Sequence, residues 1–120
     1  MIVTENRLTL GEAMAFIDIR QLPVLNKRPG WRGRLFHSQS NTFVWWEFDE
    51  NADIHRHDHE QEEVWHVIEG ELEVTIAGVT KRCGPGTAAI IPPGTAHAVR
   101  VLKAGRAIVV DYPLREGFGS

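Results

Sequence analysis

The segment His55-Arg56-His57-Asp58-His59-Glu60-Gln61-Glu62-Glu63 carries three histidines at alternate positions, followed by a run of acidic and amide side chains. Side chains of a β-strand alternate between its two faces, so the three imidazoles would share one face if the strand runs straight through them. Two imidazoles on successive positions of one face can chelate a single metal ion. The alternative interpretation is an exposed polar strand end, because the residues between and after the histidines are all hydrophilic.

Short apolar or alternating runs continue on both sides of this segment, separated by turn residues every eight to twelve positions or so. This spacing is typical of an all-β sandwich or barrel. We expect strands at residues 33–37, 42–48, 53–59, 62–68, 71–77, 79–82, 88–91, 96–102 and 107–112. In the fifth of these strands the alternation is clean, which predicts that Leu72, Val74 and Ile76 face the interior.

The N-terminal part of the chain allows two interpretations. Thr9, followed three residues later by Glu12, resembles a helix-capping box, and Phe16 could lie on the inner stripe of a short helix. Alternatively, residues 16–25 form an edge strand that ends at Pro23 and either extends the sheet or contacts a second subunit.

Length and cysteine content indicate one small domain. A chain of 120 residues can bury roughly two-thirds of the surface that its unfolded form exposes. We divide it into an N-terminal segment (residues 1–31), a β-barrel domain (residues 32–115) and a flexible tail (residues 116–120). Cys83 is the single cysteine and has no internal disulfide partner, and the N-terminus does not resemble a secretion signal, so we expect a cytoplasmic protein.

Charge and hydropathy argue against two classes of partner. No stretch approaches the roughly 18 consecutive apolar residues of a membrane-spanning helix. The net charge of −3, with acidic and basic residues interspersed, gives no basic surface for nucleic acid. One modest basic cluster, interpreted as a solvated loop in preference to a site for an anionic ligand, consists of Lys27, Arg28, Arg32 and Arg34.

The histidine segment and a second pattern together resemble the cupin superfamily. The first cupin motif, His-x-His, three or four residues, Glu, six residues, Gly, is met by His57, His59, Glu63 and Gly70. The second motif, Gly, five residues, Pro-x-Gly, two residues, His, is met by Gly86, Pro92, Gly94 and His97. The two patterns occur in the expected order and cover about half of the chain. The chain departs from the motifs at Asn51, where glycine is expected, and at Val101, where asparagine is expected.

The resemblance implies a double-stranded β-helix, or jelly-roll, cupin barrel that holds one divalent transition metal ion. The implied ligands are His57, His59, Glu63 and His97, and the ion would be iron, manganese, nickel, cobalt, copper or zinc. Such a set leaves one or two coordination positions open for water, oxygen or a substrate. His55 is an alternative ligand if the loop before Glu63 bulges by one residue.

Further residues are candidates for the pocket around the ion. Trp65 lies two positions from Glu63 and therefore shares its inward face. Trp45 or Glu47, on a neighbouring strand, could line the same pocket, and Tyr112 is a further candidate. For each tryptophan the alternative is ordinary core packing, since aromatic side chains dominate cores whether or not a ligand is present.

Two classes of function fit this sequence. The first is a metal-dependent enzyme on a small oxygen-rich metabolite, a dioxygenase if the metal is redox-active and an isomerase or lyase if it is not, with Glu47, Glu62 or Tyr112 as the general base. The second is a non-catalytic module that binds a small molecule or a metal as a sensor. The resemblance also implies a homodimer, and the apolar outer positions Val64 and Ile68 are compatible with burial in such a dimer.

Overall fold

The protein is described here from a computed structural model covering residues 14–118. Its elements are η1 (Ile19–Gln21), β1 (Val24–Arg28), β2 (Trp31–His37), β3 (Thr42–Phe48), β4 (Asp53–His57), β5 (Glu62–Ile76), β6 (Val79–Cys83), β7 (Ala88–Ile91) and β8 (His97–Tyr112). The predicted all-β class is confirmed. Within residues 14–118, no helix is long and apolar enough to span a membrane.

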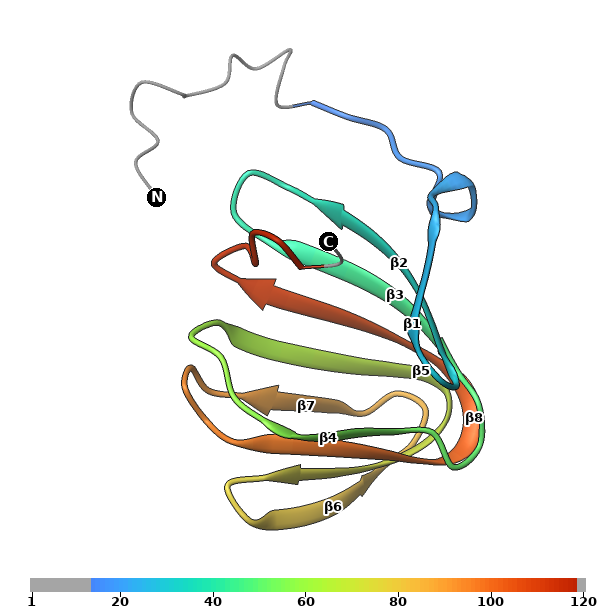
Figure 1. Cartoon of the computed structure of the whole chain (residues 1–120), viewed down its shortest axis with the longest axis vertical. Coiled ribbons are helices and arrows are strands. Elements are labelled where there is room, and N and C mark those ends of the chain that lie inside the picture. Colours follow the sequence, from blue (N-terminus) through green and yellow to red (C-terminus); the bar gives the residue numbers. More distant parts are fainter. Residues whose placement is uncertain (1–13, 119–120) are drawn as a thin grey trace.

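All eight strands are joined by antiparallel pairing into one sheet that folds over into two layers, the arrangement of a jelly roll (Figure 1). The wider layer has the order β1-β2-β3-β8-β5-β7, and the narrower layer has the order β6-β5-β8-β4. The long strands β5 and β8 belong to both layers. They pair along nearly their whole length and turn together from one layer into the other.

The turn from layer to layer occurs at two glycines. The sequence pattern predicted a break near Gly70, but β5 continues through it with a positive φ of 85° and shifted register. A Cβ on Gly105 of β8 would overlap the carbonyl oxygen of Glu69. Glycine therefore lets the two backbones bend in close contact, so four expected strands become two long ones.

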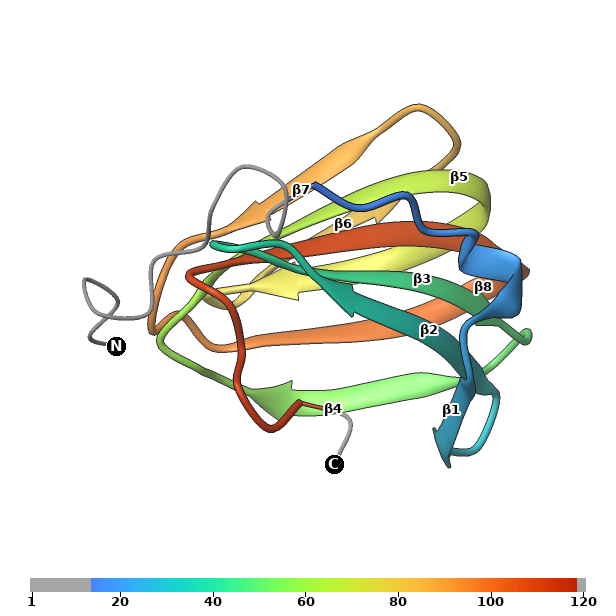
Figure 2. The ribbon, with the colours of Figure 1, turned by 90° about the horizontal axis from the view of Figure 1, so that it is seen from above.

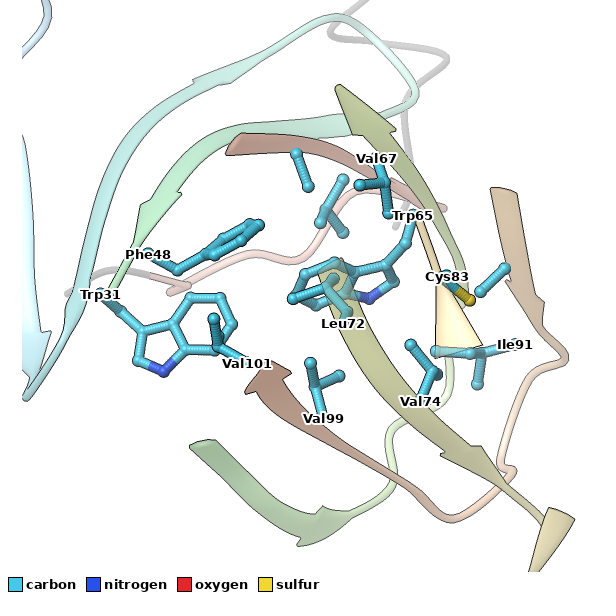
Figure 3. Close-up of a cluster of buried hydrophobic side chains, with 13 residues drawn as sticks. Trp31, Phe48, Trp65, Val67, Leu72, Val74, Cys83, Ile91, Val99 and Val101 are labelled. Atoms are coloured by element: carbon cyan, nitrogen blue, oxygen red, sulfur yellow. The ribbon is translucent and has the colours of Figure 1, made fainter. Parts of the chain in front are cut away.

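The core lies between the two layers (Figure 3). Leu72 and Val74 are buried there, and Ile76 packs against the same cluster, as the alternation of β5 predicted. Trp31 and Phe48 enter from the wider layer, with ring centroids 5.5 Å apart. The apolar side chains fill only part of the barrel, which leaves room for a cavity beside the tryptophans.

The N-terminal predictions need correction. Thr9 and Glu12 lie outside the described residues, and Phe16 is in no helix and is 98% exposed. The expected edge strand was also misplaced, because β1 begins after Pro23, where the predicted strand was to end, and pairs with β2. Proline lacks a backbone donor and is therefore better placed before an edge strand than within it. The sheet thus begins before the predicted barrel boundary at residue 32.

Candidate metal centre

Two strands and a loop bring the histidines together. His57 ends β4 and pairs in register with His97, the first residue of β8, while His59 lies in the loop that leads to β5. The register of β4 shifts between Ile54 and His57. Because of this irregularity, Ile54 and His57 both line the barrel cavity, whereas His55 is exposed. The strand therefore does not run straight through the three histidines, and His55 does not share their face.

The imidazoles of His57, His59 and His97 form one compact group. Ring centroids are 4.2 Å apart for His57 and His97, 5.0 Å for His59 and His97, and 5.6 Å for His57 and His59. Each ring offers a nitrogen within 4.8 Å of those of the other two. His55, the alternative ligand, is not part of this group, and its Nδ1 instead lies 3.2 Å from Nη1 of Arg28.

Backbone carbonyls determine which nitrogen two of these rings present. Nδ1 of His57 donates to the carbonyl of His55 over 2.9 Å, and Nδ1 of His97 donates to the carbonyl of Thr95 over 2.8 Å. A carbonyl only accepts hydrogen bonds, so both Nδ1 atoms carry a hydrogen, and each ring in its neutral form keeps its lone pair on Nε2. Metal-binding histidines are commonly oriented by such a bond on the opposite nitrogen.

Glu63 on β5 lies against the histidines and is held from several sides. Its Oε1 is 3.0 Å from Nε2 of His59, its Oε2 is 3.4 Å from Nε2 of His97, and Nε1 of Trp65 donates to Oε2 over 2.6 Å. Burial by itself would raise the pKa of Glu63, but the bonds to His59, His97 and Trp65 outweigh it and hold the pKa well below its ordinary value. Glu63 is therefore a fixed, buried carboxylate.

His57 and His97, the two rings bonded to backbone carbonyls, differ in the direction of their pKa shifts. Burial lowers the pKa of His57, which favours the neutral imidazole that a metal ion requires. Burial also opposes the charge on His97, but the contact with Glu63 and the bond to the Thr95 carbonyl raise the pKa of His97 above its ordinary value. The carboxylate of Glu63 therefore favours the protonated form of His97 when no ion is bound.

Asp111 and Arg115 were missed by the sequence analysis. Asp111 pairs in register with Glu63, is 1% exposed, and forms a second potential ligand group with His59 and Glu63. Nη1 of Arg115 lies 3.4 Å from Oδ2 of Asp111 and 3.8 Å from Oε1 of Glu63. Burial, together with the neighbouring charge of Glu63, raises the pKa of Asp111 to about 7. Oδ1 of Asp111 has no hydrogen-bond partner.

A cavity of about 270 Å³ opens beside the histidine group, and Trp65 lines it, where the sequence placed it. The tryptophan from β3 is Trp46, not Trp45, because the inward positions of β3 are the even-numbered ones. Trp45 and Glu47 lie on the outer face, near Arg106 and Arg34 respectively.

The remaining candidates for a general base also lie outside the cavity. Tyr112 is 56% exposed on the outer face, and its register neighbour Glu62 is exposed as well. The C-terminal residues 116–118, expected as part of a flexible tail, instead bring Phe118 to the cavity, where its ring lies 4.3 Å from the guanidinium carbon of Arg115.

The donor set fits a divalent transition metal. Imidazole nitrogens and one carboxylate are ligands that such ions accept. Nδ1 of His59 is buried without a hydrogen-bond partner, and the buried Nε2 of His97 has only the 3.4 Å contact with Oε2 of Glu63. Buried polar atoms are normally paired, so these incompletely paired nitrogens, on rings whose centroids are 5.0 Å apart, fit a site that an ion would complete.

Comparisons with known proteins agree with this description. The family model for the cupin domain matches residues 44–112. An RmlC-like cupin from Shewanella frigidimarina is 26% identical, with a TM-score of 0.82 over 88% of this chain and 96% of that chain. KdgF from Halomonas sp. is 25% identical, with a TM-score of 0.82 over 88% of this chain and 98% of that chain.

A more distant similarity extends to a larger protein. A variant of oxalate decarboxylase from Bacillus subtilis is 19% identical, with a TM-score of 0.74 over 81% of this chain and 29% of that chain, which shows a shared fold. Among curated protein sequences no relative matched. The family match spans more than half of the chain, both cupin motifs converge on one site, and the barrel is a jelly roll. The chain belongs to the cupin family.

Proposed function

We propose that this cupin is a metal-dependent enzyme that acts on a small, oxygen-rich metabolite, with one divalent transition metal held by His57, His59, Glu63 and His97. The observation that carries the proposal is the convergence of three imidazoles on a buried carboxylate beside a cavity. Oxalate decarboxylase from Bacillus subtilis, which has the same fold, contains Mn(II) centres, so the fold can carry such an ion.

The chain's own residues would prepare the site for this ion. His57 and His97 present lone pairs on Nε2 because the carbonyls of His55 and Thr95 occupy their other nitrogens. Glu63 supplies a negative charge that would neutralise part of the charge of the ion. The hydrogen bond from Trp65 holds the Glu63 carboxylate in place. When bound, the ion supplies Lewis acidity, and redox chemistry as well if it is iron, copper or nickel.

The cavity would admit a small ligand and keep most bulk water away. Trp31, Trp46 and Trp65 give it an apolar wall. Asp111 offers an unpartnered Oδ1 at the same cavity and is placed to accept a hydrogen bond from a hydroxyl group of the ligand. A redox-active ion would favour dioxygenase chemistry, and a redox-silent ion would favour an isomerase or a lyase.

Elemental analysis of protein purified without chelator and without a nickel column tests the proposal. We expect close to one transition metal ion per chain. Oxygen uptake on addition of phenols, diketones or sugar acids would identify a dioxygenase, whereas zinc or manganese without oxygen uptake would direct the search to isomerases and lyases. Protein that neither contains nor binds a metal would overturn the proposed function.

We also propose that the protein is a homodimer formed through the outer face of the wider layer. Register places one apolar row across five neighbouring strands of this face, consisting of Ile90, Val64, Val110, Phe43 and Phe36. Phe36 and Phe43 stack at 4.8 Å, and Ile90 is 62% exposed. A continuous apolar surface of this kind is typical of a protein–protein interface, and a two-fold axis would bury it against its own copy.

Light scattering is expected to give twice the mass of the chain at micromolar concentration. Ile90→Glu places a charge in the apolar row and should shift the protein to the monomer. Val79→Glu is the matched control, since Val79 is 58% exposed on β6 in the other layer. A wild-type protein of monomer mass, or equal behaviour of the two variants, would remove this interface.

A further inference from the structure

We infer that the substrate of this cupin is an organic acid, and that Arg28 of β1 binds its carboxylate in the cavity that the proposed metal ligands also line. This inference rests on the proposed function, because it assigns the chemical class of the molecule that shares the cavity with the ion. It adds a recognition residue from a part of the chain outside both cupin motifs.

The basic cluster of the sequence separates into two pairs in the fold. Arg32 and Arg34 point to the outer face, where their guanidinium groups lie 3.0 Å from Asp49 and 3.5 Å from Glu47. Arg28 and Lys27, by contrast, line the cavity that contains His57. The cluster is therefore not simply a solvated loop, because the half-buried Arg28 and the exposed Lys27 both lie at the cavity.

Arg28 faces this cavity without a carboxylate of its own. It is half-buried, and its side chain contacts Nδ1 of His55 over 3.2 Å. Within residues 14–118, no acidic side chain lies at ion-pair distance from Arg28. An arginine only donates, so His55 accepts this bond, and most of the five guanidinium donors remain for a ligand.

His55 connects Arg28 to the candidate metal centre. Its side chain accepts from Arg28, while its backbone carbonyl accepts from Nδ1 of His57. Figure 2 shows that β1 and β4 lie on the same side of the barrel, although they are well separated in the sequence. One residue thus contacts both the guanidinium group and a proposed metal ligand, and both of these groups line a single cavity.

The ion pairs around the cavity leave one guanidinium group for a ligand carboxylate. Arg115 is engaged by the buried acids, since its Nη1 lies 3.4 Å from Asp111 and 3.8 Å from Glu63. Arg28 is thus the guanidinium that remains available for a ligand. A planar guanidinium matches a carboxylate through two parallel hydrogen bonds. The apolar wall of Trp31, Trp46 and Val99 then suits the carbon body of the acid, and a cavity of about 270 Å³ restricts it to a small molecule.

The test compares acids with their uncharged amides on the zinc-loaded protein. The probes are lactate against lactamide and mandelate against mandelamide, with binding followed by calorimetry and by emission of the cavity tryptophans. We expect the wild-type protein to bind at least one acid about tenfold or more tightly than its amide, as charge-assisted hydrogen bonds require. In Arg28→Gln this preference should fall to about unity, and Arg28→Lys should retain part of it.

Arg56→Gln is the matched control, because Arg56 is an exposed arginine of β4, next to His55 in the sequence, and does not line the cavity. It removes the same charge and should keep the preference for the acid. Thermal unfolding of each variant verifies that it is folded. An Arg28→Gln protein that still prefers the acid would show that the carboxylate binds the ion itself, and this would overturn the inference.

Failure of the inference and failure of the proposed function can be told apart. Zinc titration of each variant, measured separately, should give one ion per chain in all of them, because Arg28 is not a proposed ligand. Loss of zinc binding in the wild-type protein would contradict the metal centre. Normal zinc binding without binding of either acid, or with tighter binding of inorganic phosphate than of the acids, would contradict the organic-acid assignment alone.

Discussion

Replacement of His97 by alanine is expected to lower the affinity for a divalent transition metal by at least about a hundredfold. Even the loss of a group that only orients a metal ligand typically costs about 10- to 100-fold in affinity, so removal of a ligand should cost more. His97 is 1% exposed, and its Nε2 has only the 3.4 Å contact with Oε2 of Glu63. The measurement is competition titration of the metal-free protein with zinc and a chromophoric chelator.

His66→Ala is the matched control for this prediction. His66 lies on the same strand as Glu63, but on the opposite face, where it is exposed. Its replacement should leave the zinc affinity unchanged. Because alanine at position 97 leaves a hole in the barrel, His97→Gln is a second variant that keeps most of the volume. Equal zinc affinity in the wild type, His97→Ala and His97→Gln would exclude His97 as a ligand.

The cupin motifs predicted the central part of the site because their spacing reflects which residues meet when the strands pair. His57 and His97 are forty residues apart, yet they pair in register where β4 and β8 meet. Alternation along β5 then correctly placed Trp65 on the same face as Glu63. The sequence could not show the irregularity of β4, which turns His55 away and Ile54 inward, because hydrogen-bond register is a property of two strands together.

The sequence analysis misplaced residues in strands with a run of apolar side chains, because such a run does not show which positions face inward. Positions 43–46 of β3 are all apolar, so the pattern did not distinguish Trp45, which lies outside, from Trp46, which lines the cavity. Residues 107–110 of β8 are also all apolar, so the pattern did not indicate that Asp111 points inward and that the candidate base Tyr112 points outward. The sequence named Arg28 only as part of a basic cluster and did not distinguish it from Arg32 and Arg34, because its contact with His55 joins two segments distant in sequence.

Asp111→Asn is expected to stabilise the metal-free protein at neutral and alkaline pH. Burial and the charge of Glu63 raise the pKa of Asp111 to about 7, from 3.8 in an exposed carboxyl group. Between about pH 4 and pH 7, the folded protein therefore keeps a proton that the unfolded chain has already released. The free energy of unfolding consequently falls as the pH rises through this window, and the contribution levels off above it.

Asparagine at position 111 cannot ionise, and its side-chain amide keeps a hydrogen-bond donor. The protonated carboxyl of Asp111 can donate to Glu63, and an amide in its place can do the same. We expect the two proteins to be about equally stable near pH 4 and the variant to be more stable by about 2–4 kcal/mol at pH 8. Urea unfolding after removal of metal, repeated across this range, measures the difference.

Asp58→Asn controls for the loss of one negative charge, since Asp58 is exposed in the loop after β4. This change should leave the pH dependence of unfolding as it is in the wild type. Parallel curves for the wild type and Asp111→Asn would mean that Asp111 is ionised in the folded state throughout the range. The charge of Arg115 would then outweigh burial and the repulsion of Glu63, and the candidate metal centre would hold two negative charges before any ion enters.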